Sequence, residues 1–189
     1  MKKTTYKITF NSPVVLGFVA LCLLATLSNY LTAGKSNELL FMTYHSSLKD
    51  PLTYVRLFTH VLGHGGWDHF MGNVVYLLLL GPMLEEKYGG KRILLVILIT
   101  ALVTGLINYI FFWNVALCGA SGVCFAFMLL SSFTGFKRGE IPLTVILVTV
   151  IFLGQQVFDG LTLNDNISNM AHIFGGIVGC VIGTILNKR

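Results

Sequence analysis

The fold is decided by residues 93–133, which read ILLVILITALVTGLINYIFFWNVALCGASGVCFAFMLLSSF and contain no charged side chain. One helix of this length would be about 60 Å long, roughly twice the ~30 Å thickness of a bilayer's hydrocarbon core. The run must therefore fold back as two membrane-spanning helices. We place the break at Trp113-Asn114, where an interfacial aromatic residue precedes a turn former.

The composition of the whole chain extends this interpretation. Of 189 residues, 54% are hydrophobic and 11% are charged, and the mean hydropathy is +0.77. A soluble domain carries about 25% charged residues, so the composition excludes an ordinary soluble fold and predicts an all-α polytopic membrane protein. The net charge of +5 does not indicate nucleic-acid binding, because no basic run is interleaved with aromatic residues. The expected partner is the lipid bilayer.

Six transmembrane helices are predicted, in a single domain over residues 1–189. We treat the first as an uncleaved span, because its apolar run is longer than that of a signal peptide. Ser12 is its expected N-cap, followed by Pro13 at the favoured first position. A polar segment of some 35 residues follows, from Gly34 to Asp68. The six spans cover approximately residues 13–33, 69–84, 93–112, 117–136, 141–158 and 168–186.

The distribution of cations predicts the orientation. Ten of the 13 Lys and Arg residues lie on one side of these spans, and only Lys35, Lys49 and Arg56 lie on the other. By the positive-inside rule both termini are cytoplasmic. Glu85 and Glu86 are expected to end the second span, and a bond from one of them across the bundle is left open.

Uncharged polar residues inside spans are functional hypotheses by default. Three motifs carry them: His69-x-x-x-Asn73, Gly119-Ala-Ser121-Gly and Ala171-His172. Spans two, four and six all enter from the outer side, so these residues are expected at similar depth near the outer face.

A stripe of small residues on the sixth span predicts how the helices pack. Small residues four apart allow close helix approach in lipid. Packing the stripe on a small-residue surface of the fourth span would bring His172 within about 3 Å of Ser121 Oγ. The stripe is Ala171, Gly175, Gly179 and Gly183, and the facing surface is Gly119, Gly122 and Ala126.

This arrangement predicts acyl-transfer chemistry. His172 is the expected general base and Ser121 the nucleophile. Asn73, His69, Gly119 and the Ser121 backbone N–H are candidates to stabilise the oxyanion. The spans contain no Asp or Glu to orient His172, so the pair is read as a Ser–His dyad.

The motifs, in this order, resemble those of the rhomboid family of intramembrane serine proteases in its minimal six-helix bacterial form. The resemblance rests on Arg56, His69-x-x-x-Asn73, Gly119-x-Ser121-Gly and Ala171-His172-x-x-Gly175-x-x-x-Gly179. It implies Ser121 as nucleophile, His172 as base, and His69 and Asn73 beside the oxyanion. It further implies single-pass membrane-protein substrates, a location in the bacterial inner membrane, and an active site toward the outer face. A first loop partly within the membrane and a substrate gate at span five are also implied.

Two positions depart from the family pattern. Val55-Arg56 stands where many members have Trp-Arg, and Phe125 stands where many have a tyrosine that stacks on the catalytic histidine. We expect Phe125 to keep the stacking face without the hydroxyl.

Other functions remain as alternatives. A non-proteolytic rhomboid-like protein that binds membrane clients is the main one, and a small transporter is another. His60, His64 and His69 form H-x3-H-x4-H, which could suggest a metal site, but structural roles in the loop are favoured. No HExxH or CxxC motif is present, and we expect no metal or cofactor. The oligomeric state is left open.

Overall fold

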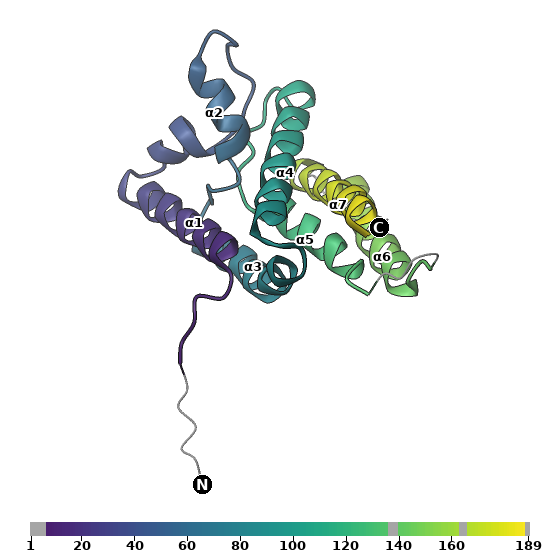
Figure 1. The fold of residues 1–189 in the computed structure, drawn as a ribbon. Coiled ribbons are helices and arrows are strands. Elements are labelled where there is room, and N and C mark those ends of the chain that lie inside the picture. Colours follow the sequence, from purple (N-terminus) through teal and green to yellow (C-terminus); the bar gives the residue numbers. More distant parts are fainter. Residues whose placement is uncertain (1–6, 136–139, 163–165, 188–189) are drawn as a thin grey trace.

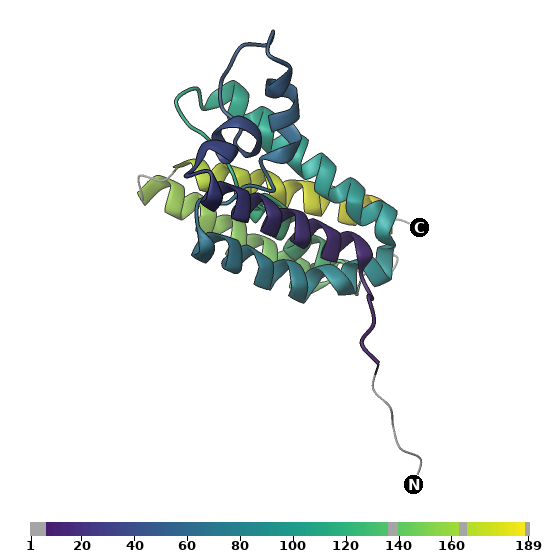
Figure 2. The same ribbon diagram turned by 90° about the vertical axis from the view of Figure 1, so that its left-hand side faces the viewer.

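The computed structural model describes residues 7–135, 140–162 and 166–187, except for the side chains at 153, 157, 159–162 and 166–168. The described chain is a bundle of helices with two short elements projecting from one end (Figures 1 and 2). In chain order the elements are α1 (Pro13–Leu31), the short π-helical turn η1 (Asn37–Phe41), α2 (Pro51–Thr59), α3 (Trp67–Tyr88), α4 (Gly90–Phe111), α5 (Ser121–Ser132), α6 (Leu143–Thr162) and α7 (Asn166–Asn187).

A helix corresponds to each predicted span. Three of them, α1, α4 and α7 over Asn169–Asn187, are long and apolar enough to cross a membrane by length and composition. The break at Trp113-Asn114 is confirmed, since α4 ends at Phe111 and a turn follows. The count of six membrane crossings stays a prediction. Six of the ten Lys and Arg residues that are predicted on the cytoplasmic side lie outside the described residues: Lys2, Lys3, Lys137, Arg138, Lys188 and Arg189.

The predicted start of the fourth span at Leu117 is wrong. Helix α5 begins four residues later, at Ser121, and Leu117 instead forms an antiparallel bridge with Thr43 in the first loop. Irregular backbone that is buried needs internal hydrogen-bond partners. The Thr43 and Leu117 N–H and C=O groups supply them through two hydrogen bonds of 2.9 Å each, and Asn108 Nδ2 donates to Val115 O.

The first loop contains a helix that the sequence interpretation did not separate from the polar segment. Asp50 accepts from Leu52 N and Pro51 occupies the first turn, which is a standard helix start. Arg56 on α2 is only 3% exposed and bonds Asp50 Oδ2 at 2.9 Å, while its guanidinium lies over the Tyr44 ring. Arg56 therefore anchors this loop through a charge pair in which the guanidinium is buried and the Asp50 carboxylate is partly exposed.

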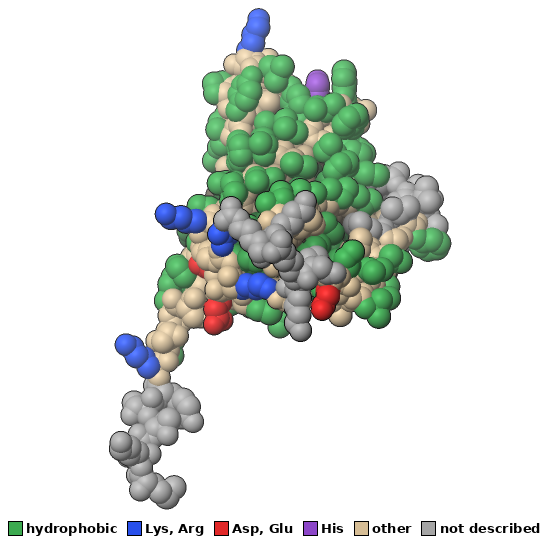
Figure 3. Space-filling model, turned by 45° about the vertical axis from the view of Figure 1, so that its right-hand side comes forward, with side chains coloured by type: hydrophobic (Ala, Val, Ile, Leu, Met, Phe, Trp, Pro, Cys, Tyr) green, Lys and Arg blue, Asp and Glu red, His purple; other side chains and the backbone are tan. Residues whose placement is uncertain are grey.

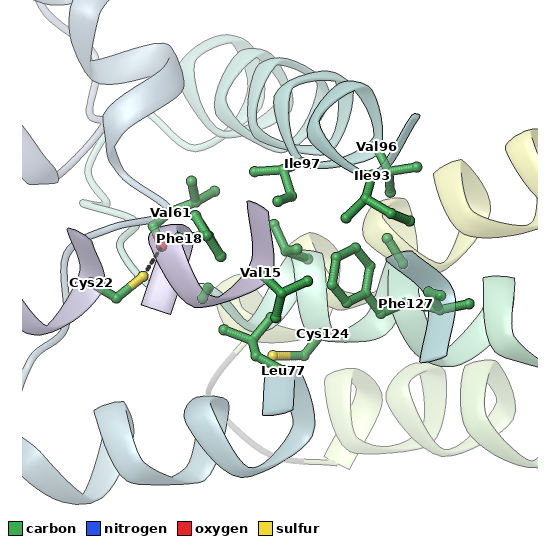
Figure 4. Close-up of a cluster of buried hydrophobic side chains, with 14 of the residues drawn as sticks. Val15, Phe18, Cys22, Val61, Leu77, Ile93, Val96, Ile97, Cys124 and Phe127 are labelled. Atoms are coloured by element: carbon green, nitrogen blue, oxygen red, sulfur yellow. Dashed lines mark hydrogen bonds between the residues drawn. The ribbon is translucent and has the colours of Figure 1, made fainter. Parts of the chain in front are cut away.

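Apolar side chains from α1, α3, α4 and α5 fill one core (Figure 4). Leu77 and Phe127 are fully buried at its centre, and Val15 and Cys22 reach it from α1. The thiol of Cys22 donates to Val61 O at 3.7 Å, the dashed contact in Figure 4. This core fixes α3 and α5 relative to each other.

The predicted close approach of α5 and α7 is confirmed. A Cβ placed on Gly175 would lie 2.9 Å from Gly122 Cα, and one placed on Gly179 would lie 2.9 Å from Ala126 Cα. Both distances are shorter than real Cβ contacts allow, so only glycine fits at either position. The backbones of the two helices are therefore in direct contact.

Ser12 holds the predicted N-cap position of α1, but its side chain makes no cap bond. Glu85, from the far end of α3, takes that role. Its Oε1 accepts from Val14 N at 3.0 Å and its Oε2 from Val15 N at 2.9 Å, which is the bond across the bundle that the sequence left open. The buried carboxylate also complements the positive end of the α1 dipole.

The starts of α3, α5 and α7 lie at one end of the bundle, and the start of α1 and the end of α7 lie at the other. Asn187 Nδ2, at the end of α7, donates to the Tyr88 hydroxyl at the end of α3. The first residues of α1 and the last residues of α7 therefore lie at the same end of the bundle (Figure 2). Figure 3 shows a broad hydrophobic surface, with most charged side chains gathered toward the end from which the N-terminal segment extends.

Candidate active site

A cavity of about 330 Å³ lies where α3, α5, α6 and α7 meet, toward the end of the bundle at which α3 and α5 begin. Its size is that of a small-ligand site. Four of the predicted site residues line it: Ser121, His172, Asn73 and His69. The remaining lining residues are Asp68, Gly72, Tyr76, Cys124, Phe125, Met128 and Phe152.

Ser121 is the first residue of α5. The first N–H groups of a helix have no intrahelical partner, and the helix dipole makes this end positive. The Ser121 side chain is therefore held beside a cluster of backbone donors. The predicted bond of about 3 Å to His172 is not formed, since no hydrogen bond joins these two described side chains. Such bonds often tighten only when substrate binds.

The ring of His172 is held in two directions. Phe125, one turn after Ser121, stacks on it with ring centroids 4.0 Å apart and planes 7° from parallel. The expected stacking by Phe125 is thereby confirmed. Phe152 of α6 in turn packs on the Phe125 ring, with ring centroids 4.2 Å apart. At the edge of the imidazole, Nδ1 lies 2.7 Å from Gln156 Oε1 of α6.

Asn73 lies on α3 with its amide oriented by α5. The Cys124 thiol donates to Asn73 O at 3.5 Å and to its Oδ1 at 3.6 Å. Asn73 is 6% exposed, and its Nδ2 has no hydrogen-bond partner among the described residues. A buried amide nitrogen without an acceptor is unfavourable unless a ligand supplies one.

His69 and Gly119 adjoin each other. Gly119 has a φ of +131°, a conformation suited to glycine, and a Cβ there would lie 2.8 Å from His69 Nε2. The Gly119 N–H donates to His60 O at 2.9 Å, so this N–H is not available to an oxyanion. Gly119 contributes the space that admits the His69 ring. Gly65 N donates to His69 Nδ1 at 3.5 Å, which leaves the proton of a neutral ring on Nε2.

The other two loop histidines form internal contacts. His60 forms two hydrogen bonds through its ring nitrogens: Nδ1 lies 3.2 Å from Arg56 O, and Nε2 lies 3.2 Å from Thr104 Oγ1. His64 Nδ1 meets Leu62 O at 3.1 Å, and its ring packs edge-on against His69. Burial lowers the pKa of both His60 and His64 to about 4. Within the described residues, no group of three or more His, Cys, Asp or Glu side chains could hold a metal ion.

Two residues of the site were missed from sequence. Gln156 lies in an apolar helix, and the rule that polar residues in spans are functional would have selected it. Cys124 gave no such signal, because cysteine reads as a small apolar residue. Its role became visible only with the contact to Asn73.

The fold and the cavity define a polytopic integral membrane protein whose helices enclose a polar site. Comparison with known families then gives a direct match: residues 51–189 match the rhomboid domain, and the chain belongs to the rhomboid family. Rhomboid-related protein 2 of Mus musculus is 31% identical over 157 residues, which are 72% of this chain and 52% of that protein. Rhomboid protease GlpG of Haemophilus influenzae is 26% identical over 183 residues, 93% of this chain and 91% of that protein. RHOMBOID-like protein 4 of Arabidopsis thaliana is 28% identical over 133 residues, 67% of this chain and 32% of that protein.

Proposed function

We propose that the protein is an intramembrane serine endopeptidase that hydrolyses peptide bonds in or near the transmembrane segments of single-pass membrane proteins. The observation that carries the proposal is the single cavity lined by Ser121, His172, His69 and Asn73, which come from three helices distant in sequence. The similarity to a protein named rhomboid protease supports the same reaction class.

In the proposed reaction Ser121 Oγ attacks the substrate carbonyl carbon while its proton passes to His172 Nε2. The carbonyl oxygen becomes an oxyanion. His172 then donates that proton to the leaving amine as the C–N bond breaks, which leaves an acyl ester on Ser121. Water, deprotonated by His172, hydrolyses the ester and restores the serine.

The oxyanion would be bound from three directions. The unpartnered Asn73 Nδ2 is one donor, the Ser121 N–H at the start of α5 is the second, and His69 Nε2–H is the third. Pre-oriented donors of this kind stabilise the charge that develops in the transition state. Gly119 enters the proposal only by making room for His69.

Substrate would enter between α3 and α6. These two helices do not pack against each other within the described residues, whereas α6 does pack on α5 and α7. Tyr76 of α3 and Phe152 of α6 line the cavity on either side of this opening. An apolar lateral route suits a substrate that arrives as a membrane helix, and α6 would be the gate.

The proposal includes a membrane topology. Six crossings with both termini in the cytoplasm of a bacterial cell would put the site toward the outer face of the inner membrane. The start of α1 and the end of α7 lie at the same end of the bundle, which agrees with an even number of crossings. Helix α5, with 12 residues, spans only about 18 Å, so Ser121 would lie below the membrane surface, within reach of water from the outer side.

The alternative is a rhomboid-like protein that binds membrane clients without cleaving them. The rhomboid domain match alone is compatible with both functions. The presence of Ser121 and His172 in one cavity and the unpartnered Asn73 amide favour hydrolysis.

The test uses purified protein, a fluorophosphonate probe and a model single-pass substrate. Wild type is compared with Ser121→Ala, His172→Ala and the control Ser132→Ala, which changes another serine of α5 whose hydroxyl donates to Leu129 O. We expect labelling and cleavage in wild type and Ser132→Ala, and a loss of at least about 10³-fold in the other two variants. Cleavage that survives in Ser121→Ala would refute the proposal. So would substrate binding without labelling or cleavage in any form, which would instead support the client-binding alternative.

A further inference from the structure

Gln156 contacts the catalytic ring from a helix that supplies neither the nucleophile nor the base. It lies on α6, 16 positions before His172, and its Oε1 is 2.7 Å from His172 Nδ1. That distance is at the short end of N–H···O hydrogen bonds. The side chain is half-buried and lies in the apolar part of α6, where an amide needs a specific partner.

The chemistry of the contact selects one form of the histidine. An amide oxygen only accepts, so the proton of the neutral ring is on Nδ1. Nε2 then keeps its lone pair, which is the form required of a general base. A ring with its proton on Nε2 could not accept a proton from Ser121.

The contact also fixes the direction of the ring. Phe125 restricts tilting through the parallel stack at 4.0 Å, but a stacked ring can still turn in its own plane. Gln156 acts at the ring edge and prevents that turn. The two contacts together restrict both the tilt and the in-plane rotation of the imidazole.

On these grounds we propose that Gln156 is a positioning residue of the active site: it holds His172 in the Nδ1-protonated form with Nε2 directed to Ser121. The inference rests on the proposed function and adds Gln156 to the Ser–His dyad read from sequence as the residue that orients the histidine. Because Gln156 is carried by α6, the base is oriented only while α6 stays packed on α7, and displacement of α6 would release it.

A neutral amide and a carboxylate at this position differ in a measurable way. The titratable groups that line the cavity with His172 are Asp68, His69, Tyr76 and Cys124. These stay constant when Gln156 alone is changed. Any change in the pH dependence of catalysis between variants at 156 therefore reports on the contact to His172.

The test compares Gln156→Leu, Gln156→Glu and the control Gln155→Leu, which removes the neighbouring, exposed amide. Gln156→Leu is expected to lower kcat about 10- to 100-fold with little change in KM or Tm, because the ring loses its orientation. Gln156→Glu keeps the acceptor, and its carboxylate favours the charged imidazolium. We expect it to restore activity and to move the acid limb of the kcat/KM profile up by about one pH unit. Gln155→Leu is expected to match wild type.

A second measurement does not depend on activity. In protein labelled with 15N in its histidines, the His172 signals are assigned by their loss in His172→Ala. We expect Nδ1 protonated in wild type and mixed tautomers in Gln156→Leu. Wild-type kinetics in Gln156→Leu, an unmoved acid limb in Gln156→Glu, or an unchanged tautomer would overturn the assignment. If wild type cleaves nothing while the tautomer still responds, the proposed function fails and the Gln156 contact stands.

Discussion

The close contact between α5 and α7 makes Gly175→Ala the most informative single substitution. The added Cβ would lie 2.9 Å from Gly122 Cα and closer still to the Gly122 carbonyl. Both neighbours are backbone atoms and cannot rotate away. The helices must therefore separate by about 1 Å to restore ordinary van der Waals contact.

Two consequences follow from this separation. Overpacking of a buried contact costs about 1–3 kcal/mol of stability. Gly122 directly follows Ser121, and Gly175 lies one turn after His172, so the same shift moves the proposed base away from the proposed nucleophile. A misplacement of about 1 Å between reacting groups lowers a rate about 100-fold.

The assay measures cleavage of a model substrate and thermal unfolding in the same detergent. Gly17→Ala in α1 is the control, because nothing lies within 4 Å of a Cβ there. Exchange of glycine for alanine in an open helix position should stabilise it by about 0.5–1 kcal/mol. Gly179→Ala should lose similar stability but less activity, because it meets Ala126, more than a turn further from Ser121. If Gly175→Ala keeps both the rate and the Tm of the wild type, close helix contact does not position the site.

Three further predictions concern the support of the site. Glu85→Gln should destabilise the protein by about 1–2 kcal/mol in detergent unfolding, because it removes the charge from the cap of α1; an unchanged Tm would contradict the cap. Burial lowers the pKa of His60 to about 4 from 6.5, so the folded state binds fewer protons between these values. The contribution of His60 to stability should therefore be full above about pH 6.5 and fall by about 3 kcal/mol toward pH 4, and His60→Asn should remove this part of the slope when unfolding is followed across the range. Cys124→Val should lower kcat about 3- to 10-fold without changing KM, since Asn73 loses its orienting donor, whereas Cys180→Val should leave kcat unchanged.

Much of the helix arrangement could be predicted from hydropathy and spacing. Two long apolar runs of defined length gave α1 and α4 within a few residues, since the thickness of a bilayer restricts helix length. The glycine spacing gave the α5–α7 contact, because small residues four apart have few other uses in lipid. These are local patterns with one dominant physical cause.

The errors occurred where a distant residue decides the outcome. Ser12 has the right chemistry for an N-cap, yet Glu85 occupies the site from about seventy residues away. Leu117 has the hydropathy of a span but pairs with Thr43 in the first loop, so α5 starts late. Gln156 reads as one polar residue in an apolar helix until its distance to His172 is known.

The backbone hydrogen bonds between Thr43 and Leu117 connect the first loop to the segment that leads into the candidate active site. Leu117 precedes the nucleophile by four residues, and Asn108 Nδ2 also donates to Thr43 O at 3.0 Å. A displacement of the first loop would therefore shift Leu117 and, with it, the position of Ser121 at the start of α5. An antibody fragment or small molecule that binds the loop and distorts these hydrogen bonds would act as a non-competitive inhibitor, because it would lower turnover without occupying the space that substrate needs.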